Sequence, residues 1–196
     1  MLVFIEYLML EVHTIGHSTH PIEEFLDLLQ SHSIAQLIDV RTIPRSSRNP
    51  QFNSEALAAS LAAKAIAYKH MPELGGLRRA RPDSINTAWR NASFRGYADY
   101  MQTPEFQAAV QTLIDDAAST PTAIMCAEAL PWKCHRSLIA DALLARGIRV
   151  LDILSPIKAT PHALTPFARV NGTEVTYPGK DQENLPLKFD APEALR

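Results

Sequence analysis

The chain has 196 residues, 46% of them hydrophobic and 20% charged, so a domain of this length can bury a sufficient core without disulfides or structural metals. The 19 Lys and Arg residues against 21 Asp and Glu residues give a formal net charge of -2. This balance excludes a protein held on nucleic acid mainly by phosphate neutralisation, although a local basic groove stays compatible with it. The 2 cysteines are too few for the disulfide framework of a small secreted domain, and we expect cytoplasmic residence.

An apolar stretch opens the sequence at residues 1–8. It is interrupted by Glu6 and is much shorter than the roughly 20 apolar residues that a membrane-spanning helix requires, so we expect no membrane segment. It also lacks the basic n-region of a cleavable signal. Met9 begins a stretch that reads as a complete first strand. We therefore expect residues 1–8 to be an upstream extension.

Strand and helix patterns alternate along the rest of the chain. In order, they predict a strand at 12–15, a helix at 21–29, a strand at 35–40, a helix at 53–65, a strand at 66–71, a surface excursion at 77–95, one or two helices across 97–114, a strand at 122–125, a helix at 134–146 and a strand at 148–154. From about residue 158, five prolines and the Asn171-Gly172 turn predict a small hairpin and a loosely ordered end.

This alternation predicts an α/β fold: a mostly parallel central sheet of about five strands with helices on both faces, plus the small C-terminal hairpin. We expect a single domain over residues 9–157, followed by the hairpin and tail at 158–196. In such sheets ligands bind beyond the carboxyl ends of the strands. The loops after residues 15, 40, 71 and 125 should all lie at that edge.

The richest chemistry lies between residues 125 and 136. Cys126 ends a predicted strand, Glu128 follows it, and Cys134 stands at a predicted helix start beside His135 and Arg136. A thiol at a helix N-terminus next to cations has a lowered pKa, which makes Cys134 a candidate nucleophile or metal ligand. Cys126 is the second candidate thiol, although both cysteines could simply pack in the core.

The other members of this stretch also have more than one interpretation each. Glu128 could act as a general acid or base, or cap the following helix. A cation in the first helical turn has an unfavourable interaction with the helix dipole. We therefore expect Arg136 to form an ion pair with a bound anion or with a carboxylate such as that of Glu128. His135 could orient a cysteine, ligate a metal or be partly exposed.

Loops at the same predicted edge add polar groups. His17 is a further candidate catalytic residue, and Ser18 beside it a candidate ligand-binding one. Arginine forks suit phosphate and carboxylate, and the loop after the second strand carries several. The predicted ligand-binding set is Ser18, Asp39, Arg41, Arg45, Arg48, Gly75, Gly76, Tyr97, His135 and Arg136. Neither a Walker loop nor a dinucleotide fingerprint is present.

Several motifs occur together in one order. They are Thr14-Ile15-Gly16-His17-Ser18, Asp39-Val40-Arg41 with Pro44, Ser47-Arg48 and Phe52, Leu74-Gly75-Gly76, Phe94-Arg95-Gly96-Tyr97-Ala98-Asp99-Tyr100-Met101, and Met125-Cys126-Ala127-Glu128 with Cys134-His135-Arg136. Over about residues 9–178 this set resembles the bacterial family catalogued as domain of unknown function 488. The resemblance implies a compact α/β domain of the bacterial cytoplasm whose biochemical activity is not established.

Three functions are compatible with these residues. The first is an enzyme acting on a phosphate-bearing or other anionic substrate, such as a nucleotide or a nucleic acid end, with catalysis by Cys126, Glu128, Cys134 and His17. The second is a metal centre of Cys126, Cys134 and His135, completed by His17 or Glu128. The third is a noncatalytic module that binds nucleic acid or an anionic metabolite. A transient disulfide between the two cysteines is a minor option, and the pattern does not identify a cofactor.

Overall fold

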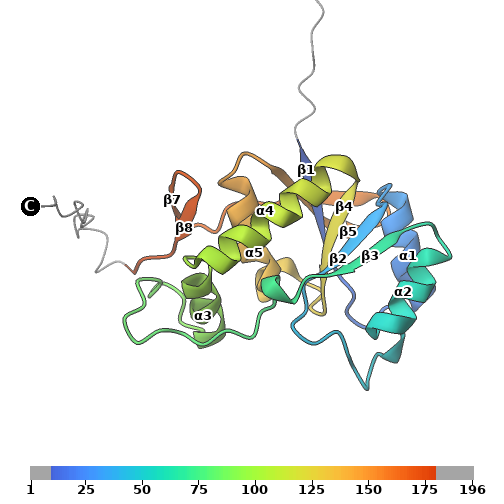
Figure 1. Ribbon diagram of the computed structural model, residues 1–196, viewed down its shortest axis with the longest axis horizontal. Coiled ribbons are helices and arrows are strands. Elements are labelled where there is room, and N and C mark those ends of the chain that lie inside the picture. The colour runs from blue at the N-terminus through green and yellow to red at the C-terminus, as the bar shows by residue number, and fades with distance from the viewer. Residues whose placement is uncertain (1–9, 180–196) are drawn as a thin grey trace, which may run out of the picture.

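The computed structural model describes residues 10–179 and shows a six-stranded sheet with helices on both faces (Figure 1). The strands lie in the order β3-β2-β4-β1-β5-β6, in which β6 is antiparallel to β5 and the other pairs are parallel. Their bounds are β1 (Glu11–Gly16), β2 (Gln36–Asp39), β3 (Ala67–His70), β4 (Thr122–Cys126), β5 (Arg149–Ser155) and β6 (Lys158–Pro161). The α/β class predicted from the sequence is confirmed.

Two helical layers enclose the sheet. Helices α1 (Ile22–Ser31) and α2 (Ser54–Ala62) pack on one face, and α3 (Ala92–Tyr100), α4 (Pro104–Ser119) and α5 (Arg136–Leu144) pack on the other. Successive strand side chains point to opposite faces. Leu37 accordingly packs in the core on the α1 and α2 side, while its neighbour Ile38 packs in the core beneath α4 and α5. Burial on both faces explains why the strands have near-continuous apolar sequences.

The strand register aligns several chain segments at one edge of the sheet. Gly16 at the end of β1 pairs with Cys126 at the end of β4, and Asp39 at the end of β2 pairs with Met125. Asp39 also pairs with His70, which ends β3. The loops that follow these strands therefore start side by side at the carboxyl edge, as the alternating pattern predicts.

The segment after β5 differs in detail from the expectation. Residues 158–161 form β6, which the sequence did not predict and which adds an antiparallel edge strand to the main sheet. The predicted hairpin is present as β7 (Arg169–Asn171) and β8 (Glu174–Thr176). The proposed upstream extension at 1–8 and the end of the chain lie outside the described residues. Across residues 10–179, no helix is long and apolar enough to cross a membrane.

Candidate active site at the carboxyl edge of the sheet

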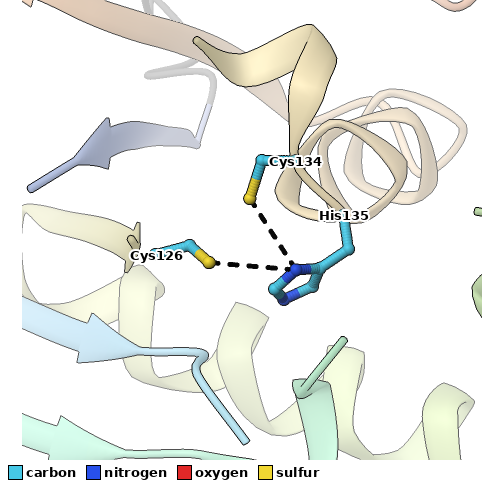
Figure 2. Close-up of side chains that lie close together, drawn as sticks. All are labelled: Cys126, Cys134 and His135. Carbon is cyan, nitrogen blue, oxygen red and sulfur yellow. Dashed lines mark hydrogen bonds between the residues drawn. The ribbon is translucent and has the colours of Figure 1, made fainter. Parts of the chain in front are cut away.

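Two thiols and one imidazole converge where β4 ends and α5 begins (Figure 2). The Nδ1 atom of His135 lies 3.9 Å from the sulfur of Cys126 and 3.7 Å from the sulfur of Cys134. All three donor atoms lie within 4.8 Å of one another, and both cysteines are buried and free of any disulfide. Cys126 is the last residue of a strand and Cys134 follows a short 3-10 turn at Pro131–Lys133, so rigid elements hold both sulfurs.

A backbone hydrogen bond fixes the tautomer of His135. The ring Nε2 lies 3.1 Å from the carbonyl oxygen of Val40, just past the end of β2. A carbonyl oxygen only accepts, so Nε2 carries the proton, and in the neutral ring Nδ1 presents its lone pair. That lone pair faces both sulfurs.

Close packing against the ring keeps His135 in place. A Cβ at Gly76 would lie 2.6 Å from Nδ1 of His135 and 2.8 Å from Cγ, so only glycine fits there. Tyr97 packs nearby with its ring centroid 5.0 Å from that of His135, and its hydroxyl donates to the Leu74 carbonyl. Gly75 lies against Thr42 in the same way that Gly76 lies against the imidazole. Of the predicted binding residues, Gly76 and Tyr97 thus pack against the imidazole of the cluster, and Gly75 packs against Thr42 beside them.

The two thiols differ in acidity. A hydrogen bond from Cys126 is the main cause that lowers the pKa of Cys134 to about 7; burial opposes it, and the charge and backbone N–H of Arg136 assist it. The same hydrogen bond, together with burial, raises the pKa of Cys126. A single proton shared between the sulfurs therefore resides on Cys126 while Cys134 is the more acidic thiol.

Arg136 has internal partners. Its guanidinium is buried and donates to the backbone carbonyls of Glu128 at 2.6 Å and Ala129 at 2.8 Å, and to the hydroxyl of Thr14 at 3.3 Å. Gly16 makes room for this arrangement, because a Cβ there would lie 1.9 Å from the Glu128 carbonyl oxygen. The predicted bound anion or carboxylate partner is replaced by main-chain oxygens, and Arg136 holds the loop after β4 in position.

Arg41 is likewise engaged within the protein. Its guanidinium forms a two-pronged ion pair with the buried Asp39, at 2.8 Å from Nε and 2.5 Å from Nη2. It also donates to the Phe52 carbonyl at 2.8 Å, and the hydroxyl of Tyr68 donates to Asp39 at 2.9 Å. Asp39 and Arg41 therefore brace the loop after β2 against its neighbours.

His17 is buried and neutral. Its Nδ1 lies 2.9 Å from the Ser18 carbonyl oxygen and its Nε2 lies 3.3 Å from Nη1 of Arg41, so the first nitrogen donates and the second accepts. Burial is the main cause that lowers the pKa of His17 to about 4. The ring also stacks on Phe52 at a centroid distance of 4.3 Å. Both nitrogens are occupied, so the predicted catalytic role of His17 gains no support from this geometry.

Three adjoining cavities open at this edge. One of about 300 Å³ is lined by Cys126, His135, Gly76 and the exposed side chains of Ile43 and Leu77, among others. A second of about 160 Å³ shares the first three of these residues and adds Cys134, Glu128 and Lys133. A larger cavity of about 610 Å³ lies at the opposite edge, around the start of β1, and contains none of the cluster residues.

The third cavity of the carboxyl edge, of about 430 Å³, has a polar lining. It includes Ser18, Ser46, Glu128 and the exposed Arg45. Arg48 is exposed on the same loop but lines none of the three cavities at this edge. Of the predicted arginines, Arg41 and Arg45 line this cavity, and Arg45 is the exposed one of the pair.

A second buried polar network was not predicted from the sequence. His162 lies between two carboxylates, with Nε2 3.2 Å from Asp141 and Nδ1 3.1 Å from Asp152. Asp141 also accepts from the Tyr177 hydroxyl, and Asp152 from Thr14. Burial lowers the pKa of His162, but hydrogen bonds to Asp141 and Asp152 outweigh it and raise the value to about 9. No local motif signals this network, because its members come from distant parts of the chain.

The comparison with protein families gives a match over most of the chain. The model described as Domain of unknown function DUF488 covers residues 21–143, which include β2 to β4, the cluster and most of α5. No curated protein and no solved structure matches the chain.

Proposed function

The chain belongs to the family described as Domain of unknown function DUF488, and on the geometry of its carboxyl edge we propose that it is an enzyme acting on a small anionic substrate. Cys126, Cys134 and His135 form the reactive centre, and Glu128 carries protons to and from the substrate. The fitting substrate class is a phosphate ester, such as a nucleotide or a nucleic acid end.

One observation carries this proposal: the reactive groups and a free carboxylate line the same cavity. Cys126, Cys134, His135 and Glu128 all border the 160 Å³ cavity. The Glu128 side chain is exposed, while its backbone carbonyl is fixed by Arg136. A carboxylate on an anchored backbone beside a cluster of two thiols and an imidazole has the placement that general acid and base catalysis requires.

The anionic part of the substrate fits the neighbouring cavity. Arg45, Ser18 and Ser46 line the 430 Å³ space, which also reaches Glu128. A guanidinium and two hydroxyls offer several donors to phosphate or carboxylate oxygens. Arg41 borders the same space, but its ion pair with Asp39 offsets its charge. We therefore assign anion recognition to Arg45 rather than to Arg41 or Arg136.

In this arrangement each residue has a separate task. Arg45 and the hydroxyls hold the anionic group, which orients the substrate and places its electrophilic atom over Cys126, Cys134 and His135. Glu128 donates a proton to the leaving group or removes one from the attacking group. Arg136 keeps the Glu128 loop still during the reaction.

A panel of phosphate esters, with nucleoside mono-, di- and triphosphates and short oligonucleotides, tests the proposal through product detection by mass spectrometry. We expect turnover of at least one member, a loss of about 100-fold or more in Glu128→Gln, and unchanged turnover in Glu174→Gln, which removes an exposed carboxylate from β8. Binding without turnover across the panel, or full activity of Glu128→Gln, would overturn it.

The anion-binding part has its own control pair. Arg45→Ala should weaken binding of the active ester about 10-fold or more, because it removes a charge-assisted contact. Arg149→Ala removes an arginine from the opposite edge, where it pairs with Glu11, and should leave binding unchanged. Equal affinity in both variants would contradict the assignment.

A further inference from the structure

We propose that Cys126, Cys134 and His135 hold one divalent cation of the zinc class, with its fourth coordination position open to the cavities at the carboxyl edge. The two thiolates and the imidazole form a mixed sulfur and nitrogen donor set, which zinc prefers over oxygen-binding cations. The inference deepens the proposed function, because a catalytic role of the metal rests on that function. Metal binding itself can be measured without any substrate.

The spacing of the donor atoms fits a tetrahedral site. With Zn–S bonds of about 2.3 Å and Zn–N bonds of about 2.0 Å, tetrahedral geometry places sulfur and nitrogen about 3.5 Å apart. The distances from His135 Nδ1 to the two sulfurs are 3.7 and 3.9 Å. Shifts of a few tenths of an ångström would bring both nitrogen-sulfur distances to this value. All three donor atoms already lie within 4.8 Å of one another, and the three side chains point toward one another (Figure 2).

The Nδ1 atom of His135 is oriented to bind a metal. Metal-bound histidines commonly donate their other ring N–H to a carbonyl or carboxylate, which fixes the ring and its tautomer. His135 makes such a contact from Nε2 to the Val40 carbonyl at 3.1 Å. The backbone of Gly76 packs closely against the ring and restricts its movement. A neutral Nδ1 lone pair aimed between two sulfurs is the arrangement that a thiolate-bound cation needs.

Among the residues that the structure describes, no fourth His, Cys, Asp or Glu joins the three donors, so the remaining coordination position would face the cavities. His17, a candidate for that role from the sequence, has both ring nitrogens engaged by Ser18 and Arg41. Cys126 and His135 border the cavities of about 300 and 160 Å³. Three protein ligands and one open position are typical of catalytic zinc, which binds a water or substrate atom there. Glu128, on the same cavity, is then placed to exchange protons with that ligand.

Metal analysis of the untagged, full-length chain, purified in a reducing buffer without chelators, tests the site directly. We expect about one zinc per chain. After chelator treatment, titration with cobalt(II) should produce thiolate-to-cobalt charge-transfer absorption that saturates at about one equivalent. Less than about a tenth of an equivalent of metal, together with no charge-transfer absorption on adding cobalt, would overturn the proposal.

Variants locate the cation. Cys126→Ser, Cys134→Ser and His135→Gln should each lower cobalt affinity roughly 100-fold or more, whereas His20→Gln, which removes a partly exposed imidazole hydrogen-bonded to Glu24, should not. Circular dichroism identifies any variant that fails to fold. The cobalt absorption spectrum of the wild-type chain shows whether thiolates bind the cation without the use of any variant. Unchanged cobalt affinity in the folded cluster variants would contradict the site.

The two proposals fail in different ways. Stoichiometric metal with no turnover of any phosphate ester overturns the proposed function and supports the metal site. Turnover that persists in a chain stripped of metal, with cobalt binding absent, overturns the metal site and supports the proposed function.

Discussion

His135 donates from Nε2 to the backbone carbonyl of Val40 at 3.1 Å, and this contact joins the start of α5 to the end of β2. The bond leaves Nδ1 facing Cys126 and Cys134. Because the acceptor is a main-chain atom held next to a buried strand, the imidazole cannot reorient without losing this hydrogen bond. The geometry of the reactive centre thus depends on packing behind the ring as much as on the ring itself.

Gly76→Ala tests this dependence. The added Cβ would lie 2.6 Å from Nδ1 of His135, so the ring must shift, which disturbs its contacts with Val40 and with the two sulfurs. We expect cobalt affinity to fall about 10- to 100-fold and the free energy of unfolding to drop by about 1 to 3 kcal/mol. Isothermal cobalt titration and urea denaturation measure the two effects.

Gly147→Ala is the matched control for that variant. Gly147 has a φ of 74° with nothing within 4 Å of an added Cβ, so alanine is strained there without touching the cluster. It should cost about 1 to 2 kcal/mol of stability and leave cobalt affinity unchanged. An equal loss of affinity in both glycine variants would show that Gly76 acts only through general stability.

Arg41→Ala should destabilise the fold rather than merely weaken ligand binding. The substitution leaves the carboxylate of Asp39 buried without its guanidinium partner, which costs about 3 to 5 kcal/mol. Adding Asp39→Ala removes the orphaned charge, so the double variant should lose clearly less stability than the sum of the single losses. A urea double-mutant cycle measures the coupling, and additive losses would contradict the ion pair.

His17 should make the protein less stable in mild acid. Burial lowers its pKa to about 4 in the folded state, against the ordinary histidine value of 6.5. Between these pH values the unfolded chain binds more protons, so the free energy of unfolding falls as pH falls from 6.5 to 4, by about 3 kcal/mol from this residue. His17→Gln should flatten that acid limb in urea titrations at several pH values. An unchanged slope would indicate that His17 titrates normally.

His162 should limit stability in the alkaline range. Its pKa of about 9 in the folded state exceeds the ordinary histidine value of 6.5, because Asp141 and Asp152 outweigh the effect of burial. The stabilisation of about 3 kcal/mol is complete below pH 6.5 and is lost as pH rises through 9. The free energy of unfolding should decline over this window in the wild type and much less in His162→Gln. Parallel slopes in the two proteins would contradict the pairing.

The sequence predicted the position of the site better than the partners within it. Alternating strands and helices require the loops after β1, β2 and β4 to meet, and the register of Gly16 with Cys126 shows that they do. Residue type and spacing could not show that Arg136 is satisfied by the carbonyls of Glu128 and Ala129, because any residue supplies a carbonyl. Tertiary structure alone selects such acceptors.

Two further features could not be predicted from local patterns. Strand β6 has four residues, ends at Pro161 and is only partly buried, so it lacks the apolar run of the central strands. The contact of His162 with Asp141 joins a segment after β6 to the middle of α5. Neither the short edge strand nor the buried carboxylate pair is marked by a repeating pattern of hydrophobic residues in the sequence. Both depend on how distant segments pack.

Zinc K-edge X-ray absorption on the metal-loaded chain is the sharpest test of the metal site, because it counts and identifies the ligands in one measurement. We expect two sulfur atoms at about 2.3 Å, one histidine nitrogen at about 2.0 Å and one further light atom from solvent. In Cys134→Ser the sulfur count should fall to one. A first shell of nitrogen and oxygen alone would contradict a reactive centre built from Cys126, Cys134 and His135.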